Sequence, residues 1–88
     1  MIEKTLTIKN PHGLHARPAA EVARLASKFE SDITIEKDGI ECNAKSIMGV
    51  MMLAAECNSQ ILIKISGIDE AEAMLAFEKL NENNFHEK

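Results

Sequence analysis

The sequence has few aromatic residues, few cysteines and no long apolar segment. It contains no Trp or Tyr and three Phe, so its core depends on aliphatic side chains and methionine. Its two cysteines, Cys42 and Cys57, lack CxxC spacing and are fewer than small disulfide-stabilised domains use, so we expect two reduced thiols. The longest apolar segment, 47–55, is too short to span a bilayer. The first residues alternate as in a strand and do not resemble a signal peptide, so we expect a cytoplasmic protein.

The sequence also has fewer basic than acidic residues. The formal net charge is −4, which argues against a nucleic-acid partner, because binding to phosphate backbones requires a basic face. Apolar residues make up 45% of the 88 residues, enough for a core, and this length predicts a single domain over residues 1–88. A domain this small has little room for a deep enclosed pocket, so we expect its chemistry to take place at the surface.

Apolar and polar residues alternate in four segments, which is typical of strands that are buried on one face. These segments are residues 2–8, 32–37, 40–44 and 60–66. The dipeptide Asp38-Gly39 between the second and third segments predicts a tight hairpin turn.

Three helices are predicted between and after these strands. The first begins near Ala16, with Pro18 in its first turn, where the missing N–H costs no hydrogen bond. Apolar residues at helical spacing predict its buried face: Ala19, Val22, Ala23, Ala26 and Phe29. The second helix follows Ser46, a good N-cap, over residues 47–55. The third begins at Asp69, with Glu72 completing a capping box, and it buries Ala73, Phe77 and Leu80. The order β-α-β-β-α-β-α predicts an α+β domain with helices on one face of an antiparallel sheet.

The segment 11–20, PHGLHARPAA, carries the strongest chemical signal. A helix that begins at Ala16 places His15 at the N-cap, beside backbone N–H groups that have no partner within the helix. These donors and the positive end of the helix dipole attract anions, and the guanidinium of Arg17 in the same turn suits phosphate oxygens. Phosphoryl transfer on His15 is therefore one interpretation. The alternative is a histidine that only flanks the helix and an arginine that is only solvated.

The helix after Ser46 is too short to bury all of its apolar side chains. Ile47, Met48, Met51 and Met52 are a core stripe in one interpretation and an exposed docking surface in the other, since methionine adapts to several partners. Ser46 itself is either a helix cap only or a hydroxyl at a helix start, where an added phosphate is tolerated.

Further charged residues follow Arg17 along the first helix. Arg24 and Lys28, seven and eleven positions on, either form a positive rim or are solvated. Glu21 is spaced to pair with Arg17 or with Arg24.

The remaining histidines, His12 and His86, lie in a loop and in the polar tail. With His15, Cys42 and Cys57 they show no metal-ligand spacing, so we expect neither a metal nor a cofactor.

Two segments together resemble a known family. GLHARPAA at 13–20 is similar to the active-site signature of the histidine-containing phosphocarrier (HPr) family of the bacterial phosphoenolpyruvate-dependent sugar phosphotransferase system. NAKSIMGVMML at 43–53 resembles the second signature of that family. The resemblance extends over nearly the whole chain and leaves out only the tail.

This resemblance implies a fold and a reaction. The fold is an open-faced β-sandwich, a four-stranded antiparallel sheet of order 1-4-2-3 covered by three helices. The histidine matching His15 accepts a phosphoryl group on Nδ1 from phosphorylated enzyme I and donates it to the IIA domain of a sugar permease, assisted by the residue matching Arg17. Such a protein is a carrier with a phosphohistidine intermediate and not a free-standing enzyme.

The resemblance also implies regulation and a docking surface. The serine matching Ser46 is phosphorylated in some bacteria by HPr kinase/phosphorylase, and that form acts with a catabolite-control regulator. The docking residues it implies are Ala16, Ala20, Ile47, Met48 and Met51, and the helical spacing predicts Arg24 at their rim. We expect a monomer with no membrane partner. The alternatives are a phosphocarrier of the nitrogen-regulatory branch, which the IMGVMML segment disfavours, and a non-catalytic interaction module.

Overall fold

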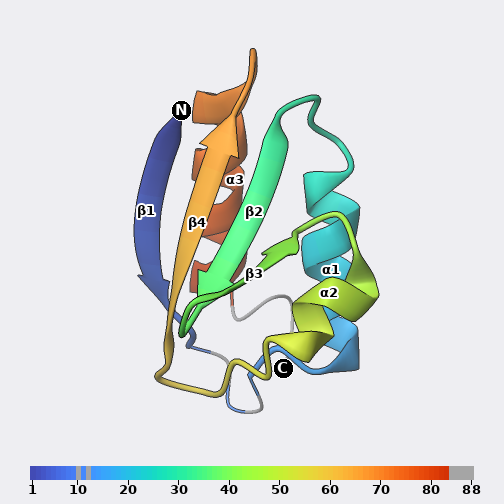
Figure 1. Ribbon diagram of the computed structural model, residues 1–88, viewed down its shortest axis with the longest axis vertical. Helices are drawn as coiled ribbons and strands as arrows, with labels where there is room; N and C mark the ends of the chain where they lie inside the picture. The colour runs from blue at the N-terminus through green and yellow to red at the C-terminus, as the bar shows by residue number, and fades with distance from the viewer. Residues whose placement is uncertain (10, 12, 84–88) are drawn as a thin grey trace.

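The computed structural model describes residues 1–9, 11 and 13–83, and it confirms the predicted order of elements (Figure 1). The strands are β1 (Ile2–Thr7), β2 (Asp32–Lys37), β3 (Ile40–Asn43) and β4 (Gln60–Ser66), and the helices are α1 (Ala16–Ala26), α2 (Ile47–Met52) and α3 (Glu70–Glu82). The strands form one sheet of order β1-β4-β2-β3 in which every neighbouring pair is antiparallel, so the predicted topology is confirmed as well.

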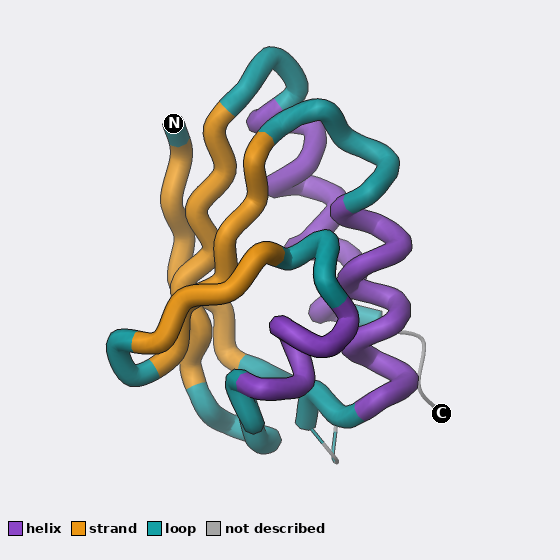
Figure 2. Tube along the Cα trace, turned by 45° about the vertical axis from the view of Figure 1, so that its right-hand side comes forward, coloured by secondary structure: helices purple, strands orange, loops and turns teal. Residues whose placement is uncertain are grey.

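The three helices lie on one side of this sheet, and the other side is open (Figure 2). Strand alternation turns one set of isoleucines toward the helices, where they are buried: Ile33, Ile35, Ile61, Ile63 and Ile65. Val22 of α1, Val50 of α2 and Phe77 of α3 are buried against them in one core. No helix in the described part of the chain is long and apolar enough to cross a membrane.

The hairpin between β2 and β3 forms as its turn residues predict. Asp38 and Gly39 both have positive φ, 52° and 83°, which is the backbone of a type I′ turn. β3 ends at Asn43, one residue earlier than expected, although the backbone N–H of the buried Ala44 still donates to the carbonyl oxygen of Ile33 at 2.9 Å, in register with the hairpin.

The second helix is shorter than its apolar sequence suggests. Only residues 47–52 of the 47–55 segment are helical, since Leu53 is the C-cap and Ala54 has a φ of 52°. A left-handed residue ends a helix, and an alanine in that conformation carries no sequence signal for it. Val50 is the one buried residue of α2.

The predicted capping box at the start of α3 is wrong. The carboxylate of Asp69 makes no capping hydrogen bond to α3, and instead accepts from the backbone N–H of Glu30 at 2.9 Å and of Ser31 at 3.0 Å. The Ser31 hydroxyl also donates to it, and this bond is the main reason that the pKa of Asp69 is lowered. Asp69 therefore links the N-terminus of α3 to the turn that precedes β2.

Candidate functional site

His15 occupies the position that the sequence predicts, at the N-cap of α1. Its backbone is extended, with φ −82° and ψ −166°, and its carbonyl oxygen accepts the first helical bond from Ala19 N–H at 2.9 Å. Its side chain is exposed. Ala16 and Arg17 are the first two residues of α1, so their backbone N–H groups have no acceptor within the helix. Such N–H groups at a helix start suit an anion.

The backbone leading to His15 is fixed against the segment after α2. Leu14 N–H donates to the carbonyl oxygen of Ala55 at 2.8 Å, and the Leu14 side chain is buried. Gly13 has a φ of 67°, and a Cβ at this position would lie 2.2 Å from the same carbonyl oxygen. Only glycine fits this close approach, which sets the position of His15 relative to α2.

The loop between α2 and β4 is a part of the site that sequence analysis missed. Ile8 N–H donates to the carbonyl oxygen of Ser59 at 2.9 Å, and Asn58 N–H donates to that of Ile8 at 2.8 Å. Asn58 has a φ of 72°, a left-handed conformation that asparagine tolerates better than most residues. Asn58 is the one residue of this loop whose type suggests its left-handed backbone, but nothing in the sequence connects it to His15.

Arg17 lies in the first turn of α1 and is exposed. The question of its pairing with Glu21 is resolved, because Glu21 forms its ion pair with Nη1 of Arg24 at 3.2 Å. Within the part of the chain that the structure describes, no carboxylate forms an ion pair with Arg17. Its guanidinium is therefore available to an anion at the helix start. Lys28, beyond the C-cap of α1, is exposed.

Ser46 is the N-cap of α2, as predicted. Its hydroxyl oxygen accepts from the backbone N–H of Gly49 at 3.0 Å, and its backbone is extended. The residue is exposed, so its hydroxyl is both a structural cap and a group on the surface.

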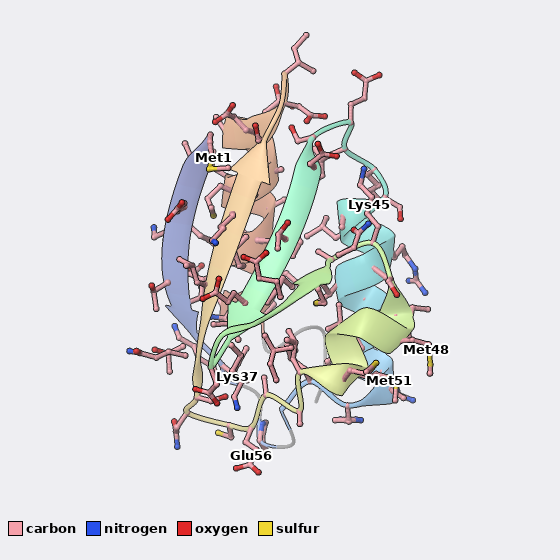
Figure 3. The ribbon with its side chains drawn as sticks, viewed as in Figure 1. Met1, Lys37, Lys45, Met48, Met51 and Glu56 are labelled. Carbon is pink, nitrogen blue, oxygen red and sulfur yellow. The ribbon has the colours of Figure 1, made fainter. Side chains whose placement is uncertain are left out.

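Apart from Val50, which is buried in the core, the large apolar residues of α2 are exposed. The relative exposures are 45% for Ile47, 68% for Met48, 38% for Met51 and 76% for Met52. α2 packs against α1, on which Ala16 is exposed and Ala20 is half-buried. Figure 3 shows Met48 and Met51 on this side of the molecule. We call the surface formed by these residues together with His15, Arg17 and Arg24 the α1–α2 surface.

On the open face of the sheet, three charged side chains from neighbouring strands pair with one another. Lys64 on β4 donates to Glu36 on β2 at 3.1 Å and to Glu41 on β3 at 2.9 Å. These bonds raise the pKa of Lys64, and the bond from Lys64 is the main reason that the pKa of Glu41 is lowered.

Two of the residues singled out in the sequence, His12 and His86, lie outside the described residues. Among the residues that are described, no group of His, Cys, Asp and Glu side chains is arranged to hold a metal ion. Cys42 and Cys57 are both free thiols, and burial raises the pKa of Cys42.

Comparison with known proteins identifies one family throughout. A family model described as "PTS HPr component phosphorylation site" matches residues 2–83. The phosphocarrier protein HPr of Treponema pallidum (strain Nichols) is 47% identical over 88 residues, which cover 100% of both chains. The crystal structure of HPr-C-His from Thermoanaerobacter tengcongensis is similar with a TM-score of 0.95 and 48% identity, over 100% of this chain and 99% of that one. A crystal structure of an HPr dimer from the same organism has a TM-score of 0.79 and 48% identity, over 99% and 100% of the chains.

Proposed function

The chain belongs to the HPr family, the phosphocarriers of the phosphotransferase system, and from this premise we propose that His15 carries the phosphoryl group. The observation that supports this assignment most directly is the placement of an exposed imidazole at the N-cap of α1, in the same turn as an arginine without an ion pair among the described residues. His15 and Arg17 also match the active-site signature of the family.

In the proposed reaction, a ring nitrogen of His15, Nδ1 by analogy with the family, attacks the phosphorus of a phosphohistidine on the donor. The new N–P bond forms as the donor's N–P bond breaks, and the same exchange runs again toward the acceptor. The transferring group spreads its charge over three oxygens. Arg17 and the first-turn N–H groups of α1 stabilise that charge.

Its partners are enzymes of the phosphotransferase system. We assign enzyme I as the donor and IIA domains of sugar permeases as acceptors, and both dock on the α1–α2 surface because both must reach the same imidazole. Ile47, Met48 and Met51 supply apolar contact, the small side chains of Ala16 and Ala20 allow close approach, and Arg24 lies at the rim. The free thiols favour the cytoplasm as the place of this exchange.

We further assign a monomeric carrier, because a copy of the chain covering α1 and α2 would compete with enzyme I for the same side chains. Sedimentation equilibrium tests this assignment. A mass of 9.7 kDa across the concentration range is expected, and a stable dimer that still accepts phosphate would contradict it.

Ser46 is the proposed regulatory site, phosphorylated by an HPr kinase/phosphorylase and then read by a catabolite-control regulator. The exposed hydroxyl at the start of α2 adjoins the apolar docking residues Ile47 and Met48. Phosphate there would add about two negative charges at the edge of the docking surface.

The test is phosphorylation by enzyme I with radiolabelled phosphoenolpyruvate. The wild-type protein is expected to acquire acid-labile, alkali-stable label, and His15→Ala is expected to acquire none while keeping the wild-type melting temperature. His12→Ala and His86→Ala are the matched controls and should be labelled normally. Label that persists in His15→Ala would assign the carrier role to another residue.

A further inference from the structure

Three of the five methionines of this chain lie on one exposed side of α2. Met51 and Met52 lie three and four positions after Met48, so both flank it on one side of the helix, and the relative exposures of the three residues are 68% for Met48, 38% for Met51 and 76% for Met52. The other two methionines differ from them in burial or in location. Met74 is in the core at 6% exposure, and Met1, at 73%, lies across the molecule at the start of β1 (Figure 3).

Two hydrocarbon side chains attach α2 to the core of the domain. Val50 is fully buried, and Leu53 at the C-cap is 4% exposed, so hydrocarbon side chains hold the helix against the core. The hydroxyl of Ser46 caps its first turn. A chemical change at the three sulfur atoms therefore leaves the burial of Val50 and Leu53 and the Ser46 cap in place.

We propose that the thioethers of Met48, Met51 and Met52 are a reversible oxidation site through which peroxide weakens docking at the α1–α2 surface. This inference rests on the function proposed above. The sulfur lone pair attacks one oxygen of hydrogen peroxide, an S–O bond forms as the O–O bond breaks, and the second oxygen leaves as water. Sulfur loses two electrons to the peroxide, and the product is methionine sulfoxide.

Oxidation opposes docking because a sulfoxide is polar and a thioether is not. A sulfoxide oxygen carried into an apolar interface loses its hydrogen bonds to water, and that loss is unfavourable unless the partner supplies a donor. His15 and Arg17 keep their structure in this step, so the transfer chemistry is intact once a partner is bound. The effect therefore falls on KM and not on kcat.

The reverse step restores the thioether. A methionine sulfoxide reductase with a thiol reductant transfers two electrons to the sulfoxide, its oxygen leaves as water, and two thiols become a disulfide. Reversal on the folded protein requires accessible sulfoxides, which the exposures of the three residues provide.

The experiment compares wild-type protein with a variant in which Met48, Met51 and Met52 are all replaced by leucine. Leucine keeps the apolar volume and cannot be oxidised, and both proteins keep the same cysteines, Met1 and Met74. Each is treated with hydrogen peroxide, mapped by peptide mass spectrometry, and assayed for phosphorylation of His15 by enzyme I across a range of carrier concentrations.

In the wild-type protein we expect oxidation at Met1 and the three α2 methionines with Met74 protected. The KM for the carrier should rise about five- to tenfold at unchanged kcat and unchanged melting temperature. The leucine variant should keep its KM after peroxide, and reductase treatment should return the wild-type KM to its starting value.

An unchanged wild-type KM after complete oxidation of the three residues would overturn the inference. An equal rise in the leucine variant would also overturn it, because the sensitive group would then lie elsewhere. If the untreated protein does not accept phosphate at all, the proposed function fails at the outset and this inference with it.

Discussion

The open face of the sheet and the α1–α2 surface differ in whether their side chains find partners within the chain. On the open face, Lys64 bridges Glu36 and Glu41, so charges on three strands pair with one another. On the α1–α2 surface, Met48 is exposed to solvent and Arg17 has no carboxylate partner among the described residues. Charges that are already paired have little to gain from a partner, whereas the helical face would gain apolar burial and an anion if partners dock there as proposed.

The largest difference between the two faces should appear when one cation is removed from each. Arg17→Gln is expected to slow phosphorylation of His15 by about 100-fold, because it removes a donor to the transferring group. Lys64→Gln, the matched cation on the open face, should leave the rate unchanged. The measurement is the single-turnover rate with phosphorylated enzyme I. Equal slowing in both variants would mean that the two faces do not differ in this respect.

Substitution of one exposed apolar residue on the α1–α2 surface and one outside it should give a smaller difference. Met51→Glu is expected to weaken binding to enzyme I and to a IIA domain by about tenfold, because a carboxylate would be carried into the interface of both. Leu75→Glu is the control, since Leu75 on α3 is also exposed, at 59%, and lies outside the proposed surface. Affinities come from calorimetric titration, and melting temperatures show whether either variant unfolds. If Leu75→Glu also weakens binding, or if Met51→Glu weakens binding to one partner only, the proposed docking surface is wrong.

A negative charge at position 46 should act on the edge of the same surface. Ser46→Asp is expected to slow phosphorylation of His15 by about fivefold through repulsion of the anionic phosphohistidine on enzyme I. Ser46→Ala should keep the rate and lose about 1 kcal/mol of stability with the cap to Gly49. Initial labelling rates at matched salt, with thermal melts, test both. If Ser46→Asp matches the wild type, Ser46 is a cap alone.

The smallest effect on transfer is expected far from the α1–α2 surface. Asp69 has a lowered pKa in the folded state, so it stabilises the fold at pH values above its unfolded pKa, and that contribution is lost as the pH falls through its folded pKa. Asp69→Asn should lower the melting temperature at pH 7 and flatten its decline in acid, with the transfer rate at pH 7 unchanged. Melts from pH 7 to about 2.5 test this. Parallel pH profiles would show that another group governs acid unfolding.

Local sequence signals predicted the elements well where each signal had one physical meaning. Asp38-Gly39 formed its turn, Ser46 capped its helix, and the helix began after His15. The capping-box prediction failed because the carboxylate of Asp69 had a second set of donors, the backbone and hydroxyl groups of residues 30 and 31, which folding brings near.

The candidate site was predictable only in part. His15 and Arg17 are adjacent in sequence, so one helix start places both. The contact of Gly13 and Leu14 with Ala55 joins positions about forty residues apart, and no spacing or propensity encodes it. Ala54 follows α2 with a left-handed backbone that its residue type does not favour, so residue preference could not predict that helix end.

The single buried residue of α2 bears on which positions of this helix tolerate substitution. Val50 fixes the helix to the core, and the Ser46 hydroxyl with Gly49 fixes its first turn. Met48 and Met52 are mostly exposed, at 68% and 76%, so mutation can replace them with little penalty to folding. If partners dock on α2 as proposed, partner preference would depend on these exposed positions, and the attachment of the helix would depend on Val50. Substitution at Met48 or Met52 could then change which partners bind while the position of α2 stays the same.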